Sequence, residues 1–294
     1  MKLKCAAALA LLFIAIDLRI ALAQSPPPTV MPSPLTLSPR ELFARTFARL
    51  ESYPIPPYVV YATLWRIRAS STGHENDVVW RYAIREANGR ENSSMPQLDA
   101  FLPKADIWQD YGPEYLGLFA SILRAPAPGV SPSPDVASGL KVIAVVAATR
   151  EDYRIDLVGT DEMDGHPTDH LGLTPLRDSA KYNLRDLWID AQSFDLRKAR
   201  FIIEHDASDP EWNGAVMTVS FGPALQYWIV MHENWYAVST LHGGAHTFDV
   251  TTLRVAFPPT LPDWLFDQSA YRRHQNAGEP DSLNEILKAS RPPA

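Results

Sequence analysis

The feature that most constrains this fold is an almost unbroken series of strand-like segments over the second half of the chain. Connections with turn residues separate them, at Asp164-Gly165, Asn213-Gly214, Gly222-Pro223, Glu233-Asn234 and Gly243-Gly244. Regular spacing of this kind predicts antiparallel hairpins in a meander, and it disfavours parallel strands joined by helices. The strands are expected at 140–149, 152–158, 168–174, 186–191, 194–204, 214–221, 224–231, 235–241 and 246–256.

The first half of the chain contributes a helix and then paired strands. Ser38 suits the helix N-cap, Pro39 the first helical position and Glu41 the third, where it can complete a capping box. Apolar residues recur at helical spacing from Leu42 to Leu50, and prolines follow from Pro54. Alternating segments at 58–69 and 77–87 then predict a hairpin, with a third, shorter strand after the Asn88-Gly89 turn.

Proline marks the boundaries of the expected domain, which spans residues 38–266. Residues 24–37 form a Pro/Ser-rich linker, and a Pro-rich loop at 125–139 follows a segment with helical spacing at 111–123. Residues 267–294 are expected to form a C-terminal tail with a short helix near Leu283–Lys288.

Residues 1–23 have the pattern of a cleavable signal peptide. Lys2 and Lys4 precede a twelve-residue apolar run, and Ala21-Leu22-Ala23 supplies the small-x-small cleavage pattern. The run is too short to span a bilayer of about 30 Å, and the alternative is a buried N-terminal helix. The sequence therefore predicts a periplasmic or secreted protein, cleaved near Ala23.

The composition of the cleaved chain excludes several kinds of functional site and disfavours some partners. The single cysteine, Cys5, leaves with the signal, so the remaining chain has no disulfide, thiol nucleophile or cysteine metal ligand. Cleavage leaves 24 basic and 33 acidic residues, a net charge of −9. An acidic surface disfavours nucleic acid as a partner, and no later apolar run is long enough for stable membrane insertion.

The order of features between Tyr153 and Phe201 is more specific. A strand, Tyr153–Leu157, precedes the turn at Asp164-Gly165 and the run His170–Pro175; Leu187-Trp188-Ile189-Asp190 and Phe194 follow. This order resembles the outer-membrane lipoprotein-sorting family (LolA/LolB-like, related to the stress regulator RseB), over about residues 38–260. The resemblance implies an α+β, mainly β fold: an antiparallel, unclosed half-barrel wrapped around one to three helices. It also implies an apolar cavity that can hold acyl chains.

Aromatic and aliphatic strand residues are the candidate ligand-binding residues for such a cavity. Ordinary core packing is the alternative explanation for the same residues. The candidates are Trp65, Trp80, Tyr82, Ile84, Tyr153, Ile155, Leu157, Leu171, Leu173, Trp188 and Trp228.

Polar motifs give no comparable candidate for catalysis, metal or cofactor. His242 and His246 are four apart, but Gly243-Gly244 favours a turn over a helical zinc site. The run Asp161–His170 has enough oxygens and imidazoles for a cation, but it lacks the ligand pattern of a calcium loop. The nucleophile-elbow and zinc-protease motifs are both missing from the sequence.

The leading interpretation is a non-enzymatic, extracytoplasmic binding protein that holds a lipid or an acylated lipoprotein in an apolar cavity. An envelope protein-interaction or stress-sensor module is the alternative, and an exported hydrolase is less favoured because no motif supports it.

Overall fold

The structure is a computed structural model, and its strands and helices lie within the compact unit Leu37–Ala294. It describes residues 37–54, 56–70, 73–87, 90–98, 118, 151–179, 182–203, 214–238 and 244–266, and part of 269–290. Five expected segments therefore lie outside the described residues, except for Leu37 and Leu118: the signal peptide at 1–23, the linker at 24–37, the helix at 111–123, the loop at 125–139 and the strand at 140–149.

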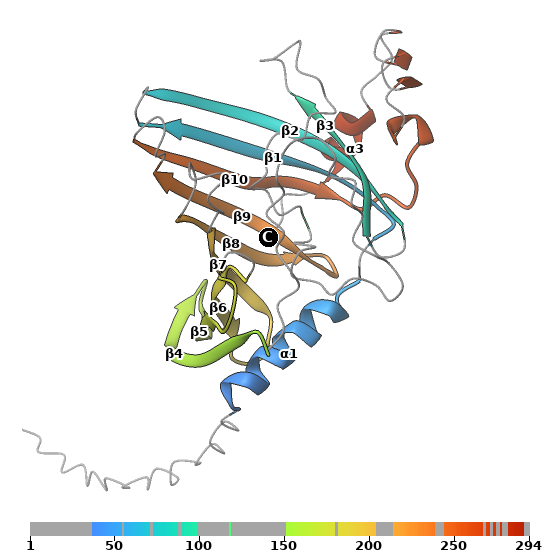
Figure 1. Cartoon of the computed structure of the whole chain (residues 1–294). Helices are drawn as coiled ribbons and strands as arrows, with labels where there is room; N and C mark the ends of the chain where they lie inside the picture. Colours follow the sequence, from blue (N-terminus) through green and yellow to red (C-terminus); the bar gives the residue numbers. More distant parts are fainter. Residues whose placement is uncertain are drawn as a thin grey trace, which may run out of the picture. The chain divides into compact units, whose positions relative to one another are not determined.

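Ten strands form a single antiparallel sheet in the order β3-β2-β1-β10-β9-β8-β7-β6-β5-β4 (Figure 1). The order is linear, with β3 and β4 at its two edges, so the sheet is open. The antiparallel, mainly β, unclosed architecture predicted from the sequence is confirmed. The strands are β1 (Tyr58–Ala69), β2 (His74–Ala87), β3 (Arg90–Leu98), β4 (Tyr153–Met163), β5 (His166–Pro175), β6 (Leu184–Asp190), β7 (Leu196–Ile203), β8 (Ala215–Ala224), β9 (Tyr227–Val238) and β10 (Ala245–Ala256).

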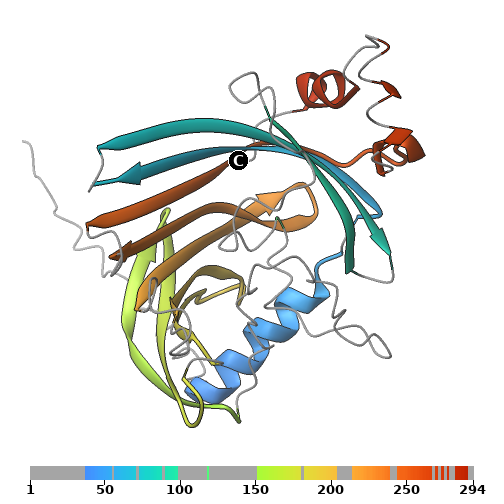
Figure 2. The same ribbon diagram turned by 45° about the horizontal axis from the view of Figure 1, so that its top comes forward.

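Helix α1 (Pro39–Ser52) begins at the predicted capping box. The Ser38 hydroxyl accepts the backbone N–H of Glu41, and the Glu41 carboxylate accepts the backbone N–H of Ser38. Leu42, Phe43 and Leu50 are buried against residues of β4 to β9. The helix lies on the concave side of the curved sheet (Figure 2), and its apolar face completes the main core.

The C-terminal segment covers the opposite face of β1 and β10. It contains a 3₁₀ turn, η2 (Asp263–Phe266), and the helix α3 (Ser282–Ala289), which confirms the short helix predicted near this point. Leu265 and Leu287 are buried against Val60 and Ala62, which alternate along β1 with the concave-facing Val59 and Tyr61. The segment is therefore part of the packed structure.

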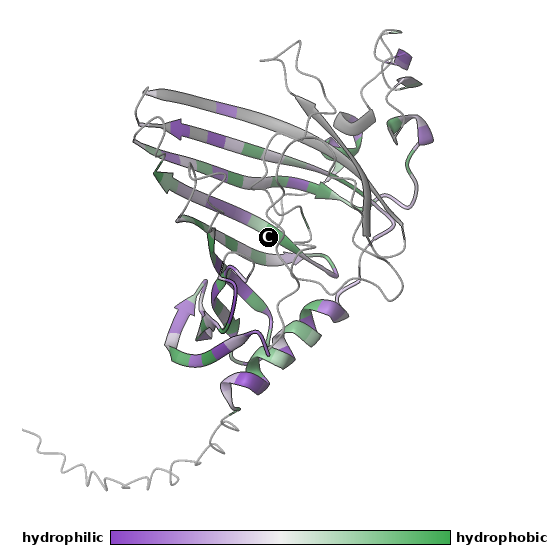
Figure 3. Cartoon of the chain, in the orientation of Figure 1, coloured by the Kyte–Doolittle hydropathy of each residue, from purple (hydrophilic) through white to green (hydrophobic). Residues whose placement is uncertain are grey.

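Alternation of buried and exposed residues accounts for the two faces of the sheet. Along β8 the burial alternates residue by residue from Ala215 to Phe221, and Figure 3 shows the same alternation as hydrophobic and hydrophilic bands on several strands. Because successive side chains of a strand point to opposite faces, this pattern fixes which face joins the core.

Two of the predicted turns are wrong. The segments expected at 224–231 and 235–241 form one strand, β9, which passes through Glu233-Asn234 without a turn. Gly222-Pro223 lies within β8, and the turn falls at Leu225-Gln226. Strand β9 contains a bulge, in which Met231 is the extra residue opposite the step from Ser220 to Phe221 of β8. The bulge shifts the alternation of side chains along β9, so that its sequence resembles two strands.

β9 and β10 separate part of the way along their length (Figure 1). Their pairing runs from Val238 and Ala245 to His232 and Thr251 and then stops. Beyond it, the Val230 N–H donates to the Leu118 carbonyl at 2.7 Å, and the Thr252 hydroxyl donates to the Val230 carbonyl at 2.7 Å. A second apolar group combines residues of β1, β8, β9 and β10 with Leu118.

Candidate functional site

The concave face of the sheet is the first element of the candidate site. Two apolar groups lie along the sheet, and the larger one covers the concave face under α1, from β4 to β9. In the smaller one, β1 contributes side chains of the concave face, whereas Tyr227 and Ile229 alternate with the larger group's residues on β9 and so project from the opposite face of that strand. Among the predicted ligand-binding residues, Trp65 belongs to the smaller group. The larger group holds Tyr153, Ile155, Leu171, Leu173 and Trp228. The structure therefore buries six of the predicted residues on this side of the sheet.

The remaining predicted residues are placed differently. Trp188 alternates with the buried Leu187 and Ile189, so it faces the convex side, where it stacks on His170 at 4.3 Å between ring centroids. Leu157 lies on the edge strand β4 and is 50% exposed. Trp80, Tyr82 and Ile84 lie on β2, at positions whose side chains fall outside the described part of the chain.

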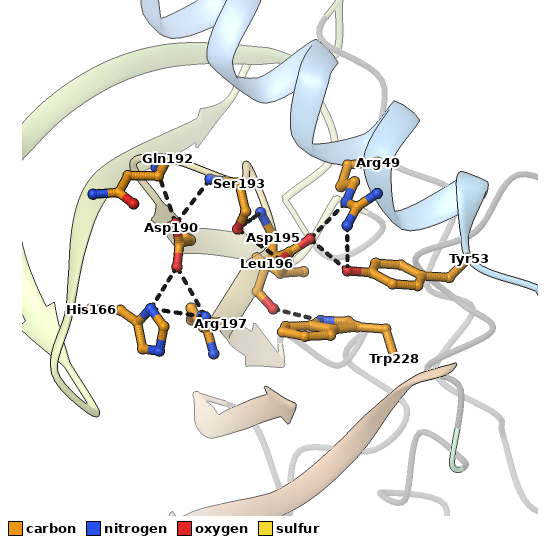
Figure 4. A network of polar contacts seen from close by, with 10 residues as sticks. All are labelled: Arg49, Tyr53, His166, Asp190, Gln192, Ser193, Asp195, Leu196, Arg197 and Trp228. Atoms are coloured by element: carbon orange, nitrogen blue, oxygen red, sulfur yellow. Dashed lines mark hydrogen bonds and ion pairs between the residues drawn. The ribbon is translucent and has the colours of Figure 1, made fainter. Parts of the chain in front are cut away.

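A polar network joins the C-terminal end of α1 to the turn between β6 and β7 (Figure 4). Asp195 is at its centre: its carboxylate accepts Arg49 Nε at 2.8 Å, the Tyr53 hydroxyl at 2.7 Å and the Ser193 hydroxyl at 2.8 Å. Asp195 is buried and Arg49 is about half exposed. These contacts attach the helix to the sheet at one end through a charge-assisted pair.

Four side chains form a stack beside this network. The Tyr53 and Trp228 rings are parallel, with centroids 5.4 Å apart. The Arg49 guanidinium lies 4.6 Å from the Tyr53 centroid, and the Arg197 guanidinium lies 5.3 Å from the Trp228 centroid. A cation therefore lies over each of the two rings, an arrangement that the ring quadrupoles favour. Trp228 Nε1 also donates to the Leu196 carbonyl at 2.9 Å, which fixes the indole.

Asp190 organises the turn itself. Burial raises its pKa, but hydrogen bonds from the backbone N–H groups of Ser193 and Gln192 and from Arg197 outweigh that effect and lower the pKa to about 2. His166 Nδ1 also lies 3.1 Å from the same carboxylate. The carboxylate is therefore held in its charged form by the folded turn.

The pKa of Tyr53 is shifted in the opposite direction, upward. Burial, together with its hydrogen bond to Asp195, raises the pKa of the Tyr53 phenol to about 12. The phenol therefore stays protonated and keeps its role as a donor to Asp195. Arg49, whose pKa is raised chiefly by the same carboxylate, stays charged. The arrangement suits attachment of a helix and supplies no group poised for proton transfer.

Sequence reasoning missed Arg49, Tyr53, Asp195 and Arg197. Asp190 was noted only as the last residue of the Leu187–Asp190 motif. A local signal exists in Asp190-Ala-Gln-Ser-Phe-Asp195, since Asp and Ser side chains commonly accept or donate hydrogen bonds within tight turns. Its partners on α1 lie too far away in the sequence to be recognised from spacing.

Within the described ranges, three or more His, Cys, Asp or Glu side chains nowhere meet in a group that could hold a metal ion. Asp161 and His170 do approach on the convex face, at 3.9 Å, but Asp161 accepts Trp188 Nε1 and His170 is hydrogen-bonded to Asp186. The helices among the described residues include none that is long and apolar enough to cross a bilayer.

Comparison with known proteins gives structural matches only. No family model and no curated protein matches the chain. A DUF1329 family protein from Desulfovibrio piger matches at 14% identity, 80% of this chain, 99% of that chain and a TM-score of 0.43. A proposed outer membrane lipoprotein-sorting protein domain from Vibrio parahaemolyticus matches at 13% identity and a TM-score of 0.39, over 79% of this chain and 97% of that chain. A LolA superfamily protein from Nitrosomonas europaea matches at 15% identity and a TM-score of 0.33, over 76% of this chain and 96% of that chain.

The resemblance to lipoprotein-sorting proteins that the sequence predicts is thus found again among solved structures. At identities of 13–15%, the likeness is one of fold alone.

Proposed function

We propose that this protein is an extracytoplasmic, non-enzymatic carrier that holds the hydrocarbon chain of a lipid or acylated protein between α1 and the concave face of the sheet. The supporting observation is the composition of that face. Apart from Glu233, which is buried beside its partner Val219, the side chains buried on it are mainly aliphatic and aromatic, and the helix that covers them contributes Leu42, Phe43 and Leu50.

The attachment of α1 suits such a role. The helix contacts the sheet through an apolar face along its length and through the Arg49–Asp195 and Tyr53–Asp195 bonds at its C-terminal end. Apolar contacts are non-directional, so a hydrocarbon chain can replace part of them at little cost. Each buried methylene contributes about 0.8 kcal/mol, which gives a long acyl chain ample free energy to compete for this surface.

The experiment is a fluorescence titration of the purified protein with a hydrophobic probe, followed by displacement with a fatty acid. We expect saturable binding that the fatty acid reverses. Two matched variants locate the site: Trp228→Phe changes a buried residue of the apolar group under α1, and Trp188→Phe changes a residue of the convex face. Weaker binding in Trp228→Phe with unchanged binding in Trp188→Phe supports the proposal. Binding that no fatty acid displaces, or that only Trp188→Phe weakens, overturns it.

A further inference from the structure

Among the described strands, β4 is one of the two edges of the sheet. One side of its backbone pairs with β5 from Tyr153 to Met163. The sheet order places no described strand on its other side. A sheet edge of this kind presents a row of N–H and C=O groups to any extended chain that can align with it.

Apolar side chains are concentrated at this edge. Leu157 is 50% exposed, Val158 60% and Leu176, which pairs with the residue before β4, 60%. They are half of the six large exposed hydrophobic residues in the described part of the chain. Natural sheet edges commonly exclude such residues, because they promote association with other chains.

The side chains of β4 also face both sides of the sheet. Leu157 pairs with the buried Leu171 and so lies on the concave side, whereas Val158 is the extra residue of a bulge and packs over the backbone of Gly172 on the convex side. A strand added next to β4 would therefore find an apolar contact on each face.

Charge defines the chemistry of the partner. β4 carries Asp156, Asp161 and Glu162 against a single cation, Arg154, and Asp164 follows in the turn. Arg154 is already paired with Asp156 at 3.0 Å. Pairing of β4 with β4 of a second copy would bring carboxylates together, which destabilises cross-strand pairs. A basic segment would be attracted instead.

We infer that β4 is a docking strand for an extended segment of another protein, one in which apolar residues alternate with Lys or Arg. The segment adds an eleventh strand to the sheet through main-chain hydrogen bonds. Because successive side chains of the segment point to opposite faces, its apolar side chains contact Leu157 on the concave side, and its cations contact Asp156 and Asp161 on the convex side. This interaction does not depend on the proposed lipid-carrier function, because it uses the outer side of the edge strand.

The test uses fluorescent nine-residue peptides, capped at both ends, that alternate Val with Lys or Val with Glu. We expect the Val/Lys peptide to bind about tenfold more tightly than the Val/Glu peptide, with a dissociation constant that rises with salt. Val158→Lys places a cation on the edge and should weaken binding of the Val/Lys peptide about tenfold. Leu157→Lys is a second edge variant, in case Val158→Lys does not fold.

Val238→Lys is the matched control, since Val238 is 52% exposed but lies on the interior strand β9. Hydrogen exchange shows where the peptide binds: the bound peptide should slow exchange of the backbone amides in Val158–Glu162. Equal binding of both peptides, equal loss in Val238→Lys, or protection elsewhere in the sheet overturns the inference. So does self-association of the protein that Val158→Lys abolishes, because it identifies a second copy as the occupant.

Discussion

The Tyr53 ring stacks on the indole of Trp228, with 5.4 Å between the ring centroids and 15° between the ring planes. Because Tyr53 directly follows α1, this contact joins the C-terminal end of the helix to β9. Tyr53 also donates to Asp195, which places one aromatic residue in both the apolar and the polar attachment of the helix. The strength of each attachment can be measured separately.

Stacking between Tyr53 and Trp228 should appear as a coupling energy. We expect a double-mutant cycle with Tyr53→Leu and Trp228→Leu to give about 1 kcal/mol of interaction in urea unfolding. The control cycle combines Tyr53→Leu with Trp188→Leu, which lies on the other face of the sheet, and should give a coupling near zero. Equal coupling energies in both cycles would show that the stacking contact itself contributes nothing specific to the free energy of unfolding.

Replacement of Asp195 should loosen the end of α1. We expect Asp195→Ala to lower the free energy of unfolding by about 2 kcal/mol, because Arg49, Tyr53 and Ser193 lose their common acceptor. Amide exchange at Leu50–Ser52 should accelerate. Glu51→Gln, an exposed change in the same turn, is the control and should stay within about 0.5 kcal/mol of wild type. Unchanged exchange in Asp195→Ala would contradict this account.

Acid should destabilise the turn at Asp190. The pKa of this carboxyl is about 2 in the folded protein and lies below its ordinary value of 3.8, so its stabilising contribution is complete above the ordinary value and is lost as the pH falls toward 2. That loss should amount to about 2 kcal/mol in urea unfolding measured from pH 5 to pH 2. Asp190→Asn should flatten the profile by this amount, whereas Asp156→Asn, exposed on β4, should leave it unchanged. If the free energy of unfolding of Asp190→Asn fell with pH as steeply as that of the wild type, the acid sensitivity would not come from Asp190.

Gly222 should be needed because of the β9 bulge. A Cβ at this position would lie 2.9 Å from Met231 Cγ, closer than packed atoms tolerate. We expect Gly222→Ala to cost about 1–2 kcal/mol in thermal or urea unfolding, and much less in a Met231→Ala background. Gly159→Ala, where the new Cβ meets nothing within 4 Å, is the control. The same cost in both Met231 backgrounds would exclude the contact as the cause.

Local patterns in the sequence were sufficient for the elements that depend on neighbouring residues. The capping box at Ser38 and Glu41 and the turn at Asp164-Gly165 use residues a few positions apart, and both are found as predicted. Asp164 and Gly165 adopt positive φ values of 51° and 76°, which suits an Asp-Gly hairpin turn. The interrupted alternation of β9 was misread because a bulge depends on the partner strand, here Ser220 and Phe221 of β8.

The candidate site was predicted less completely for the same reason. Apolar strand residues such as Leu171 reveal their face through alternation, so their place on the concave side was predictable. Arg49 and Asp195 are 146 positions apart, and only the completed sheet brings them together. The placement of Trp188 on the convex face followed from the register of β6, which its sequence alone did not fix.

The pairing of β1 with β10 has a consequence for the kinetics of folding. Tyr61 and Val255 are direct partners although 194 positions separate them, so the first strand of the sheet finds its second neighbour only when the last strand is available. Contacts between such distant residues are slow to form, because the entropy of a long loop must be lost before pairing begins. During synthesis from the N-terminus, one side of β1 remains an unpaired edge until Ala245–Ala256 has emerged. A nascent or truncated chain that ends before β10 should therefore aggregate more readily than the complete protein, and it should depend more on chaperones.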